Sequence, residues 1–154
     1  MDRFEREISS YGSYHTQKTN KLLHIIGTPV IIYGILVAAS HVTITFFGTR
    51  IAGEWLLAGG LAAWYVFFHL IYGGIAGVWI LGLAALVTNA WQLNESGRWF
   101  LIAGTQILGW ALLFIGHFVE KRKPALLDNL SHVLNAAPFV TAEAIEMITG
   151  KNFR

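Results

Sequence analysis

Histidine is the residue type in this sequence that most readily supports chemistry. Five histidines are candidate metal ligands at this point, namely His15, His24, His69, His117 and His132. Neutral imidazole nitrogens suit iron, zinc, copper or nickel. The spacing alone is not diagnostic, because His15 and His24 are nine residues apart, which on one continuous helix is roughly opposite faces at about 100° per residue. They can converge only if the chain breaks between them, and the polar stretch from Thr16 to Asn20 permits such a break.

Charged side chains follow His117 and form a second group of candidates. Glu120 comes three residues after His117, on the same helical face. It could ligate a metal, orient a ligating histidine, or pair with the basic residues beside it. Arg122 and Asp128 are the other catalytic candidates, since a planar guanidinium can bind a substrate carboxylate with two hydrogen bonds. Arg122 could equally pair with Glu120 or Asp128, or belong to a basic signal that fixes membrane orientation.

Several classes of protein are excluded by what the sequence lacks. There is no cysteine, which excludes disulfides, thiolate metal sites and a cysteine nucleophile. The zinc-protease motif HExxH, the GxSxG elbow and a phosphate-binding glycine-rich loop are all absent. The HxxxH and HxxHH set of di-iron desaturases is also absent. A formal charge of +2 is too small to indicate nucleic-acid binding.

The composition indicates the elements that must position these residues. Hydrophobic residues make up 55% of the 154 residues and charged residues only 13%, against roughly a quarter charged in soluble domains. Four apolar runs approach the roughly 20 residues that cross a membrane. They are Leu22 to Ser40, Trp55 to Tyr72, Ile75 to Trp91 and Trp99 to Val119. We therefore predict an all-α, polytopic transmembrane helical bundle with four crossings, forming one domain over residues 1–154.

The two ends of the chain and the helix boundaries carry further expectations. The first 20 residues lack the apolar core of a signal peptide, so the first run is expected to be a retained helix. An amphipathic N-terminal helix is predicted from Phe4, Ile8 and Tyr11, lying on the membrane surface or under the bundle. Asn20 is placed to cap the first long helix, and Gly73-Gly74 to form a turn between the second and third.

The last segment, Leu130 to Ile148, contains polar residues that suit a lipid-facing span poorly. An interfacial or re-entrant segment packed against the bundle is expected. A fifth crossing is the alternative.

Basic residues predict the orientation of the bundle. With four crossings both termini share one side, which holds nine of the eleven lysines and arginines; the other side holds Arg50 and Arg98. Both termini are therefore expected to be cytoplasmic. Five of the six histidines then lie near the cytoplasmic face, and only His41 lies at the far side. Ionisable groups in membrane helices are expensive and usually functional. The alternative is that these histidines bond to backbone or lipid headgroups near the interface.

Two stretches of the sequence resemble the motifs of a small membrane family. The first comprises Tyr14-His15, Asn20 and His24, followed by Gly27 and Pro29. The second is the run from Gly116 to Leu126, GHFVEKRKPAL, followed by Asp128-Asn129-Leu130 and Ala137-Pro138. The chain is similar to the membrane-bound 2-hydroxy fatty acid dioxygenases from about Tyr11 to Phe139. The characterised fungal member acts in the α-oxidation step of phytosphingosine breakdown.

The resemblance implies an enzyme that requires iron(II) and uses molecular oxygen. It would shorten a 2-hydroxy fatty acid by one carbon and release carbon dioxide, without 2-oxoglutarate. His15, His24 and His117 match the motif histidines and are the implied iron ligands. His132 stands where glutamine is expected in the fungal relative, so it could add a ligand here. His69 is not part of the motif.

Two other readings of the histidines are retained. One is a small non-enzymatic membrane protein, such as a transporter or an assembly factor, with structural or proton-relay histidines. The other is a haem-binding cytochrome with two histidines on different helices. The short loops and termini favour a bacterial inner membrane over the endoplasmic reticulum. The expected partners are a 2-hydroxy fatty acid, O₂ and membrane lipid.

Overall fold

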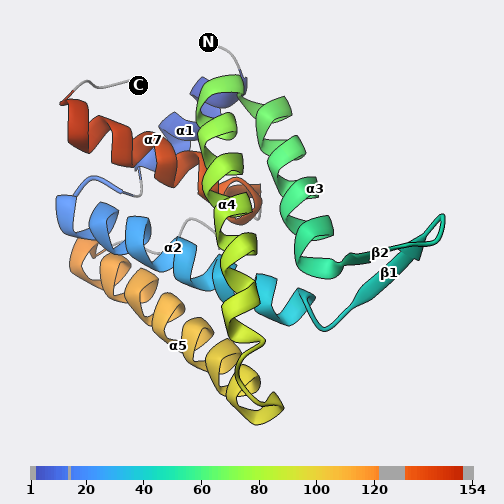
Figure 1. Ribbon diagram of the computed structural model, residues 1–154. Coiled ribbons are helices and arrows are strands. Elements are labelled where there is room, and N and C mark those ends of the chain that lie inside the picture. The colour runs from blue at the N-terminus through green and yellow to red at the C-terminus, as the bar shows by residue number, and fades with distance from the viewer. Residues whose placement is uncertain (1–2, 14, 122–130, 151–154) are drawn as a thin grey trace.

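The computed structural model describes residues 3–13, 15–121 and 131–150, with the side chains of residues 6–13, 15–121 and 133–150. Figure 1 shows the arrangement of its elements. In chain order they are α1 (Arg3–Ser13), α2 (Lys18–Ala39), β1 (Thr43–Phe46), β2 (Thr49–Ala52), α3 (Gly53–Phe68), α4 (Leu70–Ala90), α5 (Glu95–Glu120), α6 (Ser131–Leu134) and α7 (Ala136–Thr149). The fold is helical apart from one hairpin.

Helices α2 and α5 form a closely packed antiparallel pair, which lies at the lower left of Figure 1. Glycine permits the close approach. A Cβ atom on Gly27 would lie 3.1 Å from the Gly109 carbonyl oxygen, and one on Gly109 would lie 3.0 Å from the Gly27 carbonyl oxygen. Further along the pair, a Cβ on Gly34 would meet the Thr105 hydroxyl at 2.1 Å. The expectation that small residues mediate helix packing is met at these contacts.

Helices α3 and α4 form a second antiparallel pair, and α4 crosses in front of α2 in Figure 1. The predicted turn at Gly73-Gly74 was wrong, because the chain reverses at His69, whose backbone is extended (φ −158°, ψ 121°), and both glycines lie inside α4. Gly73 serves packing instead. A Cβ there would lie 1.7 Å from the Tyr65 carbonyl oxygen, so only glycine lets α4 begin against the end of α3.

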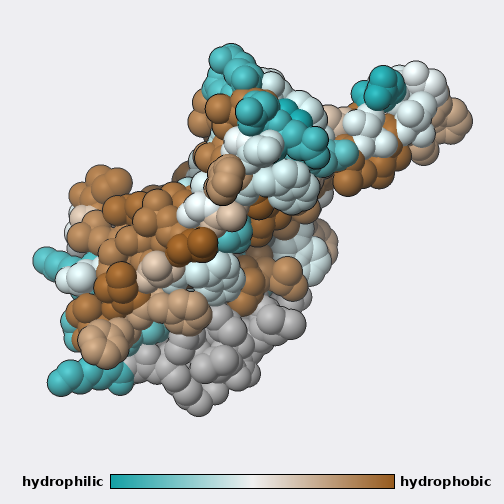
Figure 2. Space-filling model, turned by 90° about the horizontal axis from the view of Figure 1, so that it is seen from below, coloured by the Kyte–Doolittle hydropathy of each residue, from teal (hydrophilic) through white to brown (hydrophobic). Residues whose placement is uncertain are grey.

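The prediction of an all-α fold omitted the β1–β2 hairpin between α2 and α3. Thr43 pairs with Ala52, and Phe46 pairs with Thr49. β-Branched and aromatic residues favour strands. The two turn residues, Phe47 and Gly48, have φ of 46° and 79°, as a type I′ hairpin turn requires. The hairpin projects from the helices in Figure 1 and Figure 2.

Three helices are long and apolar enough to cross a membrane, namely α2, α4 and α5. Apolar side chains cover much of the face shown in Figure 2. On α5, Phe100 is 78% exposed and Phe118 is 84% exposed, as expected of side chains that contact lipid rather than water. The chain is therefore a membrane protein. Four crossings are not confirmed, since the remaining long helix, α3, has 16 residues, or about 24 Å, against a hydrocarbon core of about 30 Å.

The terminal helices pack against each other and against the bundle. The predicted N-terminal helix is confirmed as α1, and its Ile8 and Tyr11 are buried beside Phe139 and Ala142 of α7. The side chain of Phe4 lies outside the described residues. Helix α7 contacts α2 and α4 and has 14 residues. It packs against the bundle as expected and is not among the three candidate spans, while its interfacial or re-entrant position stays a prediction.

Candidate metal centre

Three histidines from distant parts of the chain converge at one end of the α2–α5 pair. His15 lies in the connector between α1 and α2, His24 on α2, and His117 near the end of α5. All three are buried, with 1%, 4% and 6% of their surface exposed. The ring centroids are 4.3 Å apart for His15 and His24, 5.1 Å for His15 and His117, and 4.9 Å for His24 and His117. We call these three residues the histidine cluster.

The break between α1 and α2 allows the first two histidines to meet. Helix α1 ends at Ser13 and α2 begins at Lys18, so His15 belongs to neither helix. The direction of its side chain is therefore not set by the helical repeat of α2. This confirms that the chain breaks between His15 and His24. His117 approaches because α5 runs close to α2 at Gly116, where a Cβ would lie 2.2 Å from the Asn20 side-chain oxygen. Glycine at this position thus permits the third imidazole to reach the other two.

Backbone carbonyl groups orient two of the three rings. Nδ1 of His15 bonds to the Tyr11 carbonyl oxygen at 2.9 Å, and Nδ1 of His24 bonds to the Asn20 carbonyl oxygen at 3.0 Å. A carbonyl accepts only, so each Nδ1 carries the proton and donates it. The lone pair is then on Nε2 of each ring, which is the arrangement found in metal-ligating histidines. Both acceptors lie four residues before their histidine, one helical turn back along the chain.

The donor set fits a divalent transition metal ion. One ring nitrogen from each of the three residues lies within 4.8 Å of the other two. Nδ1 of His117 is buried, and among the described residues it has no hydrogen-bond partner. Buried polar nitrogens are usually bonded, and a metal ligand role would satisfy this one. Three neutral imidazoles match the preference of iron, zinc, copper or nickel.

Glu120 joins the start of α2 to the end of α5. Its carboxylate accepts hydrogen bonds from the backbone N–H of Thr16 (2.6 Å), the Thr16 hydroxyl (2.5 Å), and the side-chain Nδ2 of Asn20 (2.7 Å). The Gln17 backbone N–H also donates to it, at 3.2 Å. This carboxylate therefore accepts hydrogen bonds from donors at the N-terminus of α2, where the helix dipole favours negative charge. Thr16 follows His15 directly, so Glu120 fixes the connector that carries this histidine.

The expected helix cap was wrong, and the reason is the same carboxylate. Gln17 is the N-cap of α2 and makes no side-chain cap hydrogen bond. Asn20 lies inside the helix and donates to Glu120. A carboxylate from a distant helix replaces the local cap. No local pattern predicts this exchange, because the partner is 100 residues away.

The remaining candidates lie elsewhere. Arg122 and Asp128 are outside the described residues. His132 belongs to α6, and its side chain is outside the described residues. His69 caps α4 by accepting the Tyr72 backbone N–H on Nδ1 at 3.2 Å. His41 follows the far end of α2 and stacks on Trp99, with ring centroids 5.2 Å apart.

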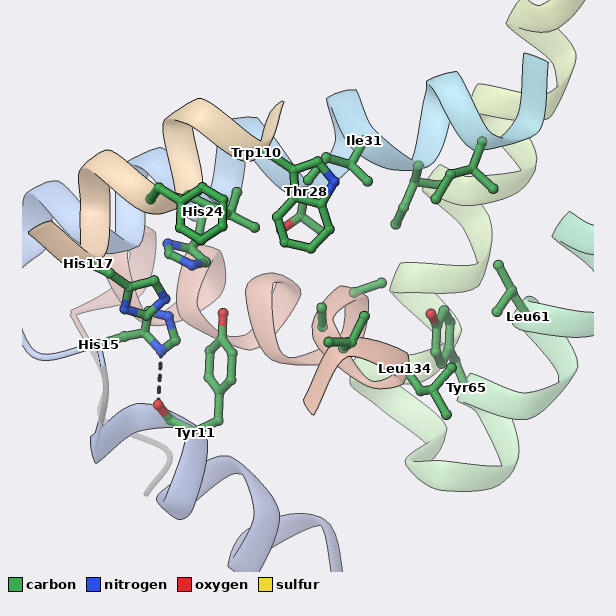
Figure 3. A pocket seen from close by; sticks show the side chains of 17 residues that line it. Tyr11, His15, His24, Thr28, Ile31, Leu61, Tyr65, Trp110, His117 and Leu134 are labelled. Carbon is green, nitrogen blue, oxygen red and sulfur yellow. Dashed lines mark hydrogen bonds between the residues drawn. The ribbon is translucent and has the colours of Figure 1, made fainter. Parts of the chain in front are cut away.

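An apolar cavity extends from the histidine cluster between α2, α5 and α3 (Figure 3). Its volume is about 230 Å³. The α2 wall consists of Ile31, Ile32 and Ile35, and the α5 wall of Trp110, Leu113 and Phe114. Figure 3 shows Leu61 and Tyr65 of α3 at the end away from the histidines. The cavity therefore has a polar end with potential metal ligands and an apolar length suited to a hydrocarbon chain.

Two polar residues of this cavity were not found as site residues from the sequence. Tyr11 was assigned only to the apolar face of the N-terminal helix, and Thr28 was not singled out. Both line the cavity near the histidines. Tyr11 is four residues before His15, and Thr28 is four residues after His24. That one-turn spacing from a candidate ligand is the signal that could have identified them.

Comparison with known proteins identifies the family of this chain. The model of the family described as "Mpo1-like: 2-hydroxy-palmitic acid dioxygenase Mpo1-like" matches residues 1–150. The chain is 32% identical over 135 residues to the 2-hydroxy-palmitic acid dioxygenase MPO1 of Saccharomyces cerevisiae. That alignment covers 86% of this chain and 74% of the yeast protein. No solved structure matches the chain. Over nearly its whole length, the chain belongs to the Mpo1-like family.

Proposed function

We propose that this protein is an iron(II)-dependent dioxygenase that shortens 2-hydroxy fatty acids by one carbon. The observation that carries the proposal is the convergence of three buried histidines at the end of an apolar cavity. Family membership supports a dioxygenase role, and the yeast relative is named for 2-hydroxy-palmitic acid. The metal and the reaction are our inference for this chain.

The histidine cluster would hold the iron. Three neutral ligands leave coordination positions open for substrate and oxygen, as in other non-haem iron oxygenases. Iron(II), when bound, supplies the electron transfers that let molecular oxygen react with an organic acid. The carbonyl oxygens of Tyr11 and Asn20 hold two of the rings in the ligating tautomer. Burial of all three imidazoles keeps bulk water away from the reacting groups.

The overall reaction balances without an external reductant. One 2-hydroxy acid and one O₂ give the acid one carbon shorter, one CO₂ and one water. The bond between C1 and C2 breaks, C1 leaves as CO₂, and C2 becomes the new carboxyl carbon. The organic acid loses four electrons and O₂ gains four. A second substrate that donates electrons, such as 2-oxoglutarate, is therefore unnecessary.

The length of the cavity suits a long acyl chain. The α2 residues that line it run from His24 to Ile35, which is about 16 Å at about 1.5 Å per residue. An extended hydrocarbon advances about 1.25 Å per carbon, from bonds of about 1.5 Å that meet at about 111°. About 13 carbons thus fit beside this wall. A volume of about 230 Å³ over such a length leaves room for one chain.

Metal analysis with product analysis tests the proposal. The purified protein should contain iron, show no Soret band, and convert 2-hydroxypalmitate to the C15 acid with release of CO₂. A Soret band would indicate a haem protein instead. A metal-free protein that forms no product after iron is added would indicate a structural role for the histidines, as in a small transporter or assembly factor.

We also propose that α3 crosses the membrane together with the three candidate spans, so that both termini are cytoplasmic, in a bacterial inner membrane. The support is the distribution of lysine and arginine, with nine residues on the side of the termini and two on the other. The chain has no cysteine, so single cysteines can be labelled specifically. A membrane-impermeant reagent added outside the cell should reach Gly48→Cys and Ser96→Cys and should not reach Lys18→Cys or Asn152→Cys. Labelling of Asn152→Cys from outside contradicts the orientation.

A further inference from the structure

We propose that Tyr11 and Thr28 form the subsite that binds the polar head of the 2-hydroxy acid. The proposal rests on the proposed function and adds two substrate-binding residues to it. The head group carries a carboxylate and a neighbouring hydroxyl. Burying such groups in an apolar cavity is costly unless they are hydrogen-bonded. Any oxygen of the head group that does not bind the proposed metal would need a hydroxyl or N–H donor at the end where the histidines lie.

Tyr11 offers a hydroxyl donor for the substrate head group on one side of the histidine cluster. Its side chain is 4% exposed, and its ring stacks on His15 with centroids 4.0 Å apart. The ring also contacts Phe139, at 4.8 Å between centroids, which fixes its position from the α7 side. Figure 3 shows the hydroxyl directed into the cavity, toward the space below His24. A phenol held in this way presents an O–H donor with little loss of side-chain freedom on binding.

Thr28 offers a hydroxyl donor on the α2 side of the cavity. Thr28 is 5% exposed and lines the cavity one helical turn beyond His24. Beyond Thr28 the lining of α2 becomes entirely aliphatic, with Ile31, Ile32 and Ile35. The polar lining of α2 therefore ends at the same level as the histidine cluster. Tyr11 and Thr28 come from different helices and flank the entrance to the acyl part of the cavity (Figure 3).

Such a subsite explains discrimination as well as affinity. A site that hydrogen-bonds a substrate hydroxyl rejects the analogue without it, because its own polar groups are then left unpaired. The chain should thus prefer 2-hydroxypalmitate to palmitate, although the two acids have the same acyl length. Apolar contacts alone could not make this distinction.

Two conservative replacements test the subsite. Tyr11→Phe retains the ring stack and the backbone carbonyl that orients His15, and Thr28→Val retains the shape of the side chain. Both should bind the normal amount of iron. Since a hydrogen bond to a charged group is involved, Tyr11→Phe should lower kcat/KM for 2-hydroxypalmitate about tenfold to a hundredfold. Thr28→Val should lower the preference for 2-hydroxypalmitate over palmitate by about tenfold.

Matched controls remove the same hydroxyl groups elsewhere. Tyr33 donates to the Leu86 carbonyl oxygen outside the cavity, and Thr88 donates to the Ala85 carbonyl oxygen on α4. Tyr33→Phe and Thr88→Val should behave like the wild-type chain. Equilibrium binding of 2-hydroxypalmitate is measured in parallel without oxygen, so that no turnover is needed. The Kd should rise by the same factor as kcat/KM falls.

The outcomes separate the subsite from the proposed reaction. Wild-type Kd values for both Tyr11→Phe and Thr28→Val overturn the subsite, even if the enzyme is active. Loss of iron from Tyr11→Phe in proportion to its loss of activity also overturns it, because the residue would then act only through His15. If the wild-type chain binds 2-hydroxypalmitate and forms no product, the proposed reaction fails. The binding comparison still decides the subsite in that case.

Discussion

Replacing Glu120 by glutamine should loosen the metal centre without touching a histidine. The Glu120 carboxylate accepts three short hydrogen bonds, from the Thr16 N–H, the Thr16 hydroxyl and the Asn20 amide. A hydrogen bond to a charged group is worth about 1.5–3 kcal/mol, and a neutral one about 0.5–1.5 kcal/mol. Replacing three charged hydrogen bonds by neutral ones, at about 1 kcal/mol each, would lower the free energy of unfolding by at most about 3 kcal/mol. Flipping of the Asn20 amide can recover part of it, so we expect a loss of about 2 kcal/mol.

This loss should appear in both stability and metal affinity. Thr16 and Asn20 flank the segment between His15 and His24, so a looser connector lets His15 move away from the other two rings. Residues that orient metal ligands typically change affinity by tenfold to a hundredfold. The measurements are the thermal midpoint in detergent and the iron Kd by competition with a chelator. Glu95→Gln is the control, because Glu95 is an acidic residue near a helix N-terminus, in the first turn of α5 and at the opposite end from Glu120.

Two results would contradict this reasoning. If Glu120→Gln keeps the thermal midpoint and the iron Kd of the wild-type chain, the carboxylate does not hold the connector. If iron is lost while the thermal midpoint is unchanged, Glu120 acts as a ligand rather than as a positioning residue. A Thr16→Ala chain separates these cases further, because it removes one of the three bonds and no potential ligand.

Four other predictions concern the metal, the cavity and the charged end. Alanine at any position of the histidine cluster should abolish iron binding while the chain still inserts into the membrane; iron retained by His117→Ala contradicts the ligand set. Iron affinity should fall in acid, because protons compete with the metal for the imidazole nitrogens, and equal affinity at pH 7.5 and pH 4 opposes this. Leu61→Trp should shift turnover of mixed 2-hydroxy acids toward shorter chains, about fourfold per carbon, whereas exposed Leu56→Trp should leave the product profile unchanged. Arg122→Gln should lower kcat/KM about tenfold to a hundredfold with iron still bound; normal kinetics with a lowered thermal midpoint would rule out a substrate role.

The sequence was informative where a local pattern determines the structure. Ile8 and Tyr11 are spaced for one helical face, and they are buried together beside α7. The polar stretch between His15 and His24 predicted the break that lets these histidines meet. Long apolar runs predicted α2, α4 and α5, because crossing a membrane requires length and hydropathy that few other segments have.

Features that depend on distant contacts could not be predicted in this way. Gly73 has the composition of a turn, but its missing side chain is needed for packing against Tyr65 of α3. Asn20 has the position of a cap, but Glu120 takes that role from 100 residues away. Phe47 is an unusual residue for a hairpin turn with positive φ. For Gly73 and Asn20 the residue type has a common local use, and a contact with another helix decides a different one.

The separation of His15 from His117 also orders the assembly of the protein during synthesis. The end of α5 at Glu120 follows the end of α2 at Ala39 by 81 residues, and a ribosome adds about 5–20 residues per second. Helix α2 is therefore complete roughly 4–16 s before α5, the helix that it packs against. Throughout that interval His24 and the start of α2 lack the imidazole and the carboxylate that α5 brings. A nascent chain released before residue 117 would have at most two of the three proposed ligands, so metal binding by all three would require α5.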